Sequence, residues 1–188
     1  MEDANLETNV RVRLLLAGLS EMEEHGEGDF SLRRVAKRAQ VSCAAPYRHF
    51  RDKEELIDGI FAYLLEKWDL LCREIARAFS EDHARHLTEL SLAYLRFWLS
   101  NPNYRSVLLS RASARRREAF DAPLCRTAEI LAHAHGMSTD DTHRLTFAVL
   151  STVYGALLLA PQDTEEIQNT VTAAKEQITF TLNALPAL

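Results

Sequence analysis

The sequence predicts an all-α protein, and three observations support this fold class. Apolar residues recur at helical spacing over long stretches, alternating β-branched runs are absent, and only six glycines and five prolines occur in 188 residues. Most of those glycines and prolines fall between the periodic stretches, where they are expected to end helices. We therefore expect about nine helices in a globular protein of ordinary composition, with 47% hydrophobic and 26% charged residues.

Three helices are predicted in the N-terminal part. The first covers about residues 6–25 and ends at Gly26. Ser31 is a good N-cap for a short second helix with a basic outer face. After a brief break at Gln40, Ser42 is predicted to cap a third helix from Cys43 to about Phe50.

A long fourth helix is predicted to begin near Lys53 and to continue to Phe79, because acidic residues fill its first turn and apolar residues follow at helical spacing. The boundaries expected after it are Asn101-Pro102, Asp121-Ala122-Pro123, Gly136 followed by Ser138 or Thr139 as a cap, and Pro161 followed by Asp163 as a cap.

Positive charge is concentrated in one short segment of an acidic chain. Residues 30–53 hold seven basic residues and one acidic residue, a net charge of +6. Because the whole chain carries −5, the remainder carries −11. A basic patch on an acidic body concentrates affinity for phosphates in one place, which is typical of a nucleic-acid-binding segment.

The same segment has the features of a helix-turn-helix. Two short helices are joined by a tight turn, and small alanines allow the pair to pack closely. Ala44 and Ala45 are small enough for the third helix to press into a major groove. Hydroxyl groups, a lysine and helix N-termini surround the predicted contact, and such groups are common ligands of phosphate.

Residues 31–56, SLRRVAKRAQVSCAAPYRHFRDKEEL, resemble the DNA-binding segment of the TetR family. The matching features are the Ser cap, the V-S turn, Y-x-H-F and K-x-x-L in one register. Three residues depart from the family pattern. Gln40 stands where glycine is usual, and a left-handed conformation there would cost about 1 kcal/mol. Pro46 replaces leucine in the recognition helix, and Glu21 occupies an apolar position of the first helix.

The resemblance implies a sequence-specific transcriptional regulator, usually a repressor released from a palindromic operator by a small-molecule effector, with activation left open. It implies a helix-turn-helix DNA-binding domain in residues 1–53 and a ligand-binding and dimerisation domain in residues 54–188, linked by the fourth helix. The implied phosphate contacts are Ser31, Ser42, Tyr47, His49 and Lys53. The residues implied to lie at or near base edges are Cys43, Ala44, Ala45 and Arg48, with Arg33 and Pro46 completing the DNA-binding set. Arg48 is the best candidate for a bidentate contact to guanine.

Two further features are expected in the C-terminal domain. The helix over about residues 140–160 is apolar nearly all round, which favours burial on both sides, and family members form homodimers through their last two helices. The expected interface residues are Phe147, Leu150, Ser151, Tyr154, Gly155, Leu158, Ile167, Val171, Ala174 and Ile178. Phe61, Trp68, Tyr94, Phe97 and Trp98 form an aromatic cluster for which plain core is the favoured interpretation, and an effector pocket lined by these residues is the alternative.

Other classes of function find less support. No nucleophile elbow, P-loop, dinucleotide fingerprint or zinc-protease motif occurs, so we expect no enzyme and no cofactor. His83 and His86 could share a metal ion but lack a third ligand, and Cys43 has no neighbouring resolving cysteine. An adaptor that binds only proteins would not need the segregated basic charge. The odd, scattered cysteines and the acidic N-terminus favour a cytoplasmic protein with no membrane segment.

Overall fold

The computed structural model describes residues 2–99, 108, 114–160 and 164–185, and the described part is all-helical, as predicted. Its eight helices are α1 (Glu2–His25), α2 (Leu32–Arg38), α3 (Pro46–His49), α4 (Lys53–Ala78), α5 (His83–Leu99), α7 (Ala114–Ala134), α8 (Thr139–Leu159) and α9 (Thr164–Asn183). None of the described helices is both long enough and apolar enough to cross a membrane.

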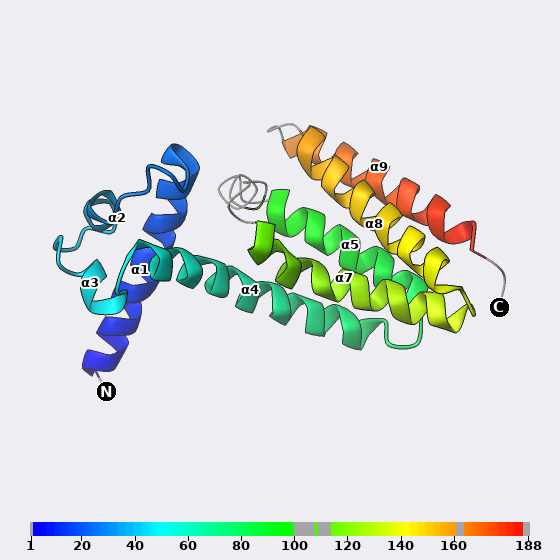
Figure 1. The fold of residues 1–188 in the computed structure, drawn as a ribbon, viewed down its shortest axis with the longest axis horizontal. Helices are drawn as coiled ribbons and strands as arrows, with labels where there is room; N and C mark the ends of the chain where they lie inside the picture. Colours follow the sequence, from blue (N-terminus) through cyan, green and yellow to red (C-terminus); the bar gives the residue numbers. More distant parts are fainter. Residues whose placement is uncertain (1, 100–107, 109–113, 161–163, 186–188) are drawn as a thin grey trace.

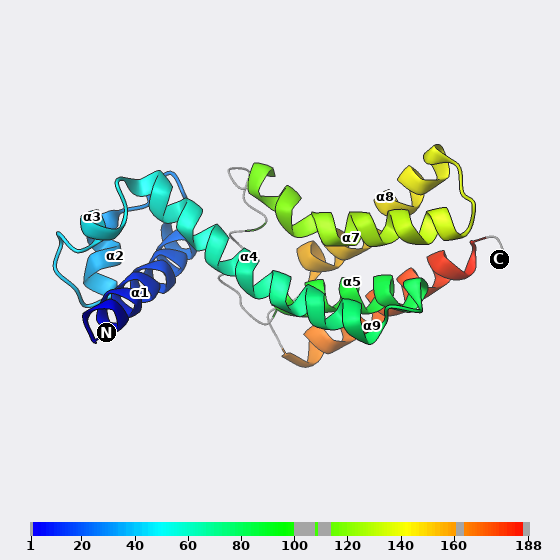
Figure 2. The same cartoon turned by 90° about the horizontal axis from the view of Figure 1, so that it is seen from below.

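The helices form a small N-terminal bundle and a larger C-terminal body (Figure 1). The bundle consists of α1, α2, α3 and the start of α4, while α5, α7, α8 and α9 pack with the rest of α4 to form the body. Figure 2 shows α4 as one continuous helix that leaves the bundle and runs along the body. α8 and α9 lie together along one edge of the body.

The long α4 was predicted correctly because its local signals agree. Asp52 caps it by accepting a hydrogen bond from the Glu55 amide at 2.9 Å, and Glu54 and Glu55 place negative charge at the positive end of the helix dipole. Its buried face runs from Leu56 in the bundle to Trp68 in the body.

α1 crosses α4 at close range because glycine occupies the contact on both helices. A Cβ added at Gly18 would lie 2.7 Å from a methyl of Leu56 and 2.9 Å from a methyl of Ile60. A Cβ added at Gly59 would lie 3.0 Å from the Phe50 ring. A side chain at Gly18 would push Leu56 and Ile60 aside, and one at Gly59 would crowd Phe50 and Leu15 of α1, so both glycines favour the close approach of the two helices.

Two expected helix boundaries differ from the structure. Pro123 lies inside α7, whereas we expected a break at Asp121-Ala122-Pro123. Proline removes the amide that would bond to the Ala119 carbonyl, but Ala119 is exposed, so water can solvate that carbonyl. Ser138 caps α8 as predicted. The boundaries expected at Asn101-Pro102 and at Pro161 with Asp163 lie outside the described residues.

The turn between α2 and α3 has the conformation that the sequence implied. Gln40 has φ of 55°, in the left-handed region that favours glycine. The Arg13 guanidinium of α1 donates to the Ala39 carbonyl and, at 3.4 Å, to the Gln40 carbonyl, while the Val41 amide bonds to the Ala36 carbonyl at 3.0 Å. These backbone contacts hold the turn in place despite its unfavourable residue.

Gln40→Gly is therefore expected to stabilise the protein, by up to about 1 kcal/mol, because glycine adopts this conformation without a Cβ clash. Urea unfolding followed by circular dichroism measures the change. Gln40→Ala is the control, since alanine keeps the Cβ. If the glycine variant unfolds at lower urea than the alanine variant, the strain at position 40 has been overestimated.

Candidate DNA interface and effector core

The helix-turn-helix begins at α2, which is positioned by Ser31 as expected. The Ser31 hydroxyl accepts a hydrogen bond from the Arg34 amide at 3.4 Å. Val35 and Ala36 are buried under α2, whereas Arg33 and Lys37 face solvent. The amphipathic pattern of this helix thus leaves its basic side chains on the surface.

α3 is shorter than predicted and starts later. It covers Pro46–His49, so the prediction of a helix from Cys43 capped by Ser42 is wrong. Residues 42–45 instead form a turn, in which the Ala45 amide bonds to the Ser42 carbonyl at 2.9 Å. Pro46 is the reason, because proline has no amide to donate and is best accommodated at the first position of a helix.

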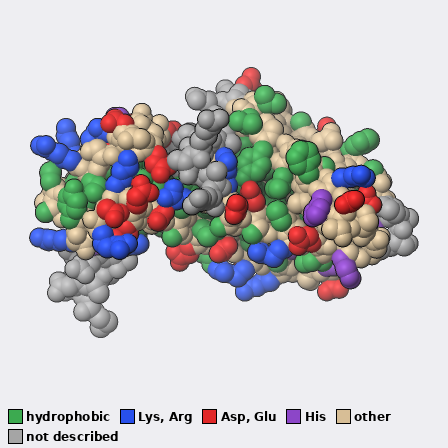
Figure 3. All heavy atoms as spheres, viewed as in Figure 1, with side chains coloured by type: hydrophobic (Ala, Val, Ile, Leu, Met, Phe, Trp, Pro, Cys, Tyr) green, Lys and Arg blue, Asp and Glu red, His purple; other side chains and the backbone are tan. Residues whose placement is uncertain are grey.

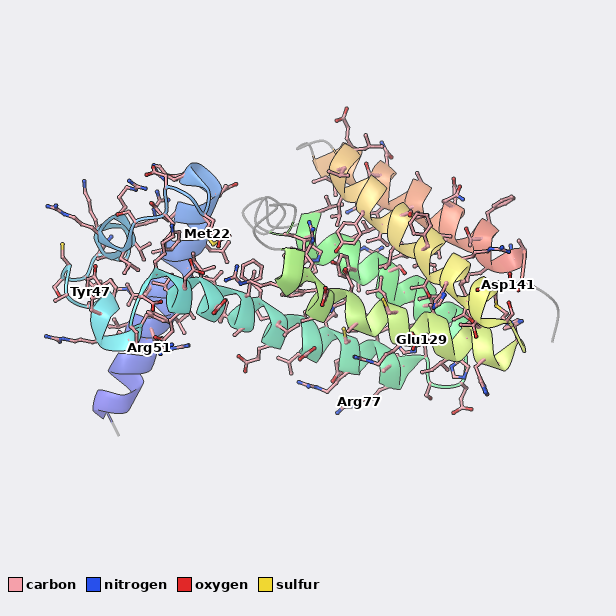
Figure 4. All side chains as sticks on the ribbon, in the orientation of Figure 1. Met22, Tyr47, Arg51, Arg77, Glu129 and Asp141 are labelled. Atoms are coloured by element: carbon pink, nitrogen blue, oxygen red, sulfur yellow. The ribbon has the colours of Figure 1, made fainter. Side chains whose placement is uncertain are left out.

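The structure separates the sequence-predicted DNA-binding residues by exposure. Those that face solvent are Arg33, Ser42, Cys43, Ala44, Tyr47 and Arg48, and those that are half-buried are Ser31, His49 and Lys53. The Tyr47 side chain is 63% exposed and lies at the outer end of the N-terminal bundle (Figure 4). Ala45 and Pro46 are buried beneath α3, so their side chains do not belong to this surface.

Ion pairing decides which basic residues remain available on this surface. Arg34 pairs with Glu21 and Asp29, Arg38 with Glu24, and Arg51 with Glu55. Arg33, Lys37 and Arg48 have no acidic partner among the described residues. Lys and Arg side chains project from the outer edge of the bundle (Figure 3). The exposed positive charge without an acidic partner in the described part of the chain therefore lies on α2, at Arg33 and Lys37, and on α3, at Arg48 next to Tyr47.

Sequence reasoning missed the role of Glu21, although it noted the residue as unusual. Its side chain is fully buried, with one carboxylate oxygen 2.5 Å from the Arg34 Nε and 3.2 Å from the Ser31 amide, which donates to it. His25 Nδ1 lies 3.4 Å from the other oxygen. This carboxylate joins α1 to the start of α2, so it orients the helix-turn-helix. In the sequence, an acidic residue at an apolar position of the first helix could have indicated a buried ion pair, with Arg34 of the next helix as the partner of Glu21.

The five aromatic residues of the expected cluster come together in the body. Trp68 of α4 meets the Tyr94 and Phe97 rings of α5 at centroid distances of 5.3 and 5.7 Å, and Trp98 lies 5.1 Å from Phe97. Phe61 and Trp98 both contact the ring of Phe120. Of the five, only Phe97 is more than slightly exposed. In this conformation the cluster packs as core, and its role as a pocket stays a prediction.

A polar triad lies beside this cluster and was not predicted. Asp121 of α7 accepts hydrogen bonds from the hydroxyls of Tyr94 (α5) and Tyr154 (α8), both at 2.7 Å, and the two hydroxyls are 2.9 Å apart. Burial raises the pKa of Asp121 above its ordinary value, although both tyrosines and Arg117 favour the charged form. Burial likewise raises the pKa of Tyr94 and Tyr154. The triad ties α7 to α5 and α8.

A groove of about 430 Å³ between α4 and α5 reaches the edge of the aromatic cluster. Leu71, Ile75, Phe79, Ala93 and Phe97 form its apolar lining, with Glu89 and Arg96 beside them. Because Phe97 belongs to both the groove and the cluster, movement of this one side chain would connect the two.

The metal and redox sites that the sequence analysis set aside gain little support from the structure. The described residues contain no group of three or more His, Cys, Asp or Glu side chains that could hold a metal ion. Burial raises the pKa of Cys72 to about 12, and it raises that of Cys125 as well, so both thiols are poor nucleophiles near neutral pH. Cys43 is exposed at the tip of the helix-turn-helix.

The residues predicted for the dimer interface divide between two faces. On α8, Phe147, Ser151 and Leu158 are exposed at helical spacing, and Gly155 on the same row faces open space. Leu150, Tyr154 and Ile167 are half-buried. Val171, Ala174 and Ile178 of α9 are buried inside the chain, so assigning them to the interface was wrong. The apolar residues that α8 and α9 expose in addition are Leu159 and Phe180.

These features define a class of protein: a DNA-binding regulator in which a basic helix-turn-helix is joined by a long helix to an all-helical body. Residues 14–60 match the family model described as bacterial regulatory proteins, tetR family. No curated protein matches the chain in sequence.

Several solved structures share the fold of nearly the whole chain. A TetR-family transcriptional regulator from Bordetella parapertussis 12822 has a TM-score of 0.73 at 14% identity, covering 95% of this chain and 99% of its own. PfmR from Thermus thermophilus, also of the TetR family, has a TM-score of 0.69 at 20% identity, covering 93% and 100%. FadR from Bacillus subtilis, solved in complex with stearoyl-CoA, has a TM-score of 0.69 at 13% identity, covering 93% and 99%. Residues 14–60 thus match the DNA-binding segment of tetR-family regulators, and nearly the whole chain shares the fold of these solved structures.

Arg34→Gln is expected to destabilise the protein, because it leaves the fully buried Glu21 carboxylate without its arginine. Glu21→Leu should cost less, since Arg34 is partly exposed and keeps Asp29. Adding Glu21→Leu to Arg34→Gln should recover at least half of the loss. Urea unfolding of the three variants tests this, and equal costs for the two single changes would contradict a buried carboxylate.

Asp121→Asn is expected to alter how stability depends on pH. Because its pKa is raised, the Asp121 carboxyl binds its proton more tightly in the folded protein than in the unfolded chain. The protonated carboxyl therefore adds to the free energy of unfolding below about pH 4, and this contribution is lost as the pH rises through the raised pKa. Asparagine keeps an oxygen that can accept from both tyrosines but does not titrate. The stability of wild type relative to Asp121→Asn should therefore fall across that window and then level off. Glu129→Gln, exposed on the same helix, is the control; parallel curves for wild type and Asp121→Asn would contradict the assignment.

Proposed function

We propose that the chain represses transcription as a homodimer that binds a palindromic operator through its helix-turn-helix and is released by a small-molecule effector. The observation that carries this proposal is the surface around α3. It presents Tyr47 and Arg48 beside unpaired basic residues, on a domain matched by the family model. We keep residues 1–53 as the DNA-binding domain and residues 54–188 as the dimerisation and effector domain.

Within this surface, we assign Ser31, Ser42, Tyr47, His49 and Lys53 to phosphates and Arg48 to a base edge. Phosphate contacts fix the position of the protein on DNA, whereas contacts to base edges select the sequence. Cys43 and Ala44 are exposed on the turn that precedes α3, so they would lie at the groove. Arg33 adds positive charge from α2.

The exposed apolar face of α8 and α9 supports a homodimer. Phe147, Leu158, Leu159 and Phe180 are each at least two-thirds exposed, and clustered apolar surface of this kind usually marks an interface. Gly155 would allow a partner helix to approach closely, because nothing within 4 Å occupies the space where a Cβ would lie. A dimer would also present two recognition surfaces to the two halves of a palindrome.

The aromatic cluster and the adjoining groove support an effector with a large apolar part. A ligand entering between α4 and α5 would meet Leu71, Ile75 and Phe79 and then Phe97. FadR from Bacillus subtilis, a protein of the same fold, was solved in complex with stearoyl-CoA, which supports an effector with a long apolar part. We propose an apolar or amphipathic effector that moves Phe97 and opens the cluster around Trp68.

The test is to select binding sites from a random pool of duplex DNA and to titrate the enriched site at two salt concentrations. The wild type should enrich a palindrome and lose affinity steeply as salt rises, since counterions are released from each contacted phosphate. Tyr47→Ala should weaken binding about tenfold to a hundredfold, the value of one hydrogen bond to a charged group. Ile130→Ala, which shortens an exposed side chain of the body, should bind as wild type does.

Two outcomes would overturn the proposal. If low salt yields no enriched sequence, the chain is not a sequence-specific DNA-binding protein under these conditions. If Tyr47→Ala binds the selected site as tightly as Ile130→Ala does, DNA does not contact the surface around α3.

A further inference from the structure

Arg116 lies where the first turns of α7 meet the N-terminal bundle. Its guanidinium contacts Asp58 of α4 at 2.7 and 2.9 Å, and lies 3.5 Å from Glu54 at the start of the same helix. A third carboxylate, Glu27 in the connection between α1 and α2, is also 3.5 Å away. The guanidinium carbon sits 5.1 Å from the ring centroid of Phe61. One side chain of the body thus contacts both α4 and the connection that leads into the helix-turn-helix.

The cluster is enclosed on one side only: Arg116 and Glu27 are partly buried, whereas Glu54 and Asp58 are about two-thirds exposed. The side chains of Arg116 and Glu27 are each only about one-fifth exposed, and Phe61 beneath them is almost fully buried. Burial opposes the charge on Arg116, but Asp58 and Glu27 outweigh it and raise the pKa of the guanidinium. Partly buried charges are screened less by salt than exposed ones. The contact should therefore persist under the salt conditions in which the protein binds DNA.

The three carboxylates make the contact depend on Arg116. Glu27, Glu54 and Asp58 all lie around a single positive charge. Without that charge they would repel one another, because like charges in a partly buried site are unfavourable. Loss of Arg116 would therefore do more than remove an attraction: it would push the α1–α2 connection away from α4.

The same stretch of α7 is fixed to the effector core. Phe120 lies one helical turn after Arg116, so both side chains are on the same face. The Phe120 carbonyl accepts a hydrogen bond from the Trp68 indole at 3.0 Å, and the next residue, Asp121, binds Tyr94 and Tyr154. Two turns of α7 thus contact the aromatic cluster at one end and the DNA-binding bundle at the other.

From this arrangement we infer that Arg116 is a positioning residue for operator binding: its contacts with Glu27 and Asp58 hold the helix-turn-helix in the pose that fits DNA. The inference rests on the proposed function. The contacts occur in a conformation whose aromatic cluster is packed shut, and in an effector-released repressor the closed core is the form that binds the operator. An effector that opens the cluster would displace Phe120 and, with it, Arg116.

The experiment measures operator affinity and thermal unfolding of the full-length dimer for Arg116→Gln, Arg116→Lys and Arg77→Gln. Arg116→Gln should weaken operator binding about tenfold, within the range of coupling between sites in allosteric proteins. Arg116→Lys should lie between it and wild type, because lysine keeps the charge but loses the planar fork and its stacking on Phe61. Arg77→Gln removes an exposed arginine paired with Glu74 at the far end of α4 and should leave affinity unchanged (Figure 4).

A second change separates positioning from simple loss of a basic residue near DNA. Adding Asp58→Asn to Arg116→Gln should restore part of the affinity, because it removes one of the mutually repelling carboxylates. A change that acted only through net charge would also raise affinity when Asp58→Asn is made in wild type. In wild type, however, we expect Asp58→Asn to weaken binding, since it removes a ligand of Arg116.

The pose itself can be followed with spin labels on the exposed Cys43 of each protomer, after Cys72 and Cys125 are replaced by serine. Without DNA, Arg116→Gln should broaden the distance distribution between the two labels, while Arg77→Gln should leave it narrow. If wild type binds a selected operator and Arg116→Gln binds it equally well, the inference is wrong and the proposed function stands. If wild type selects no operator but the labels still respond to Arg116→Gln, the proposed function is wrong and the contact between domains stands.

Discussion

The structure depends on α4 being one unbroken helix shared by two hydrophobic cores. Its 26 residues span about 39 Å at 1.5 Å per residue. Leu56 and Ile60 lie against α1 in the bundle, whereas Trp68 is buried among α5 and α7. A helix with intact hydrogen bonds does not bend sharply without a cause such as proline or glycine, and the glycine in α4, Gly59, is held in the contact with Phe50 and Leu15. Rearrangement of the body therefore has to move the bundle with it.

Within the bundle α4 packs through its first two turns, so a second contact from the body would restrict the orientation of the bundle further. The ion pairs of Arg116 provide that contact, since they reach the connection between α1 and α2 as well as α4. Two attachments fix an orientation that one attachment cannot. α4 thus sets the distance between the bundle and the body, and the Arg116 contacts of α7 set the orientation of the bundle.

The sequence predicted those features whose causes are local. The start of α4 and the cap at Ser31 follow from neighbouring residues, and the structure confirms both. The left-handed Gln40 was implied instead by the family resemblance, in which glycine is usual at this position. Features decided by distant contacts were missed. Pro123 has the signature of a helix end, yet α7 continues through it because packing on α4 and α5 holds both halves of the helix. Similarly, an apolar row on α9 looks the same whether it faces the core or a partner, so Val171 and Ile178 could not be assigned from periodicity.

The DNA-binding bundle shows why local departures from a family pattern can be compatible with its function. Glu21 and Gln40 are each unfavourable alone, one as a buried charge and the other as a left-handed residue without glycine. In the folded bundle each is matched by an arginine, Arg34 for the first and Arg13 for the turn that contains the second. These pairings also withdraw Arg34 from the surface and leave Arg33 and Arg48 exposed. An acidic chain can thus present a basic face to DNA. Its own carboxylates pair with arginines that hold the bundle together, such as Arg34, whereas Arg33 and Arg48 stay exposed and free to contact phosphates.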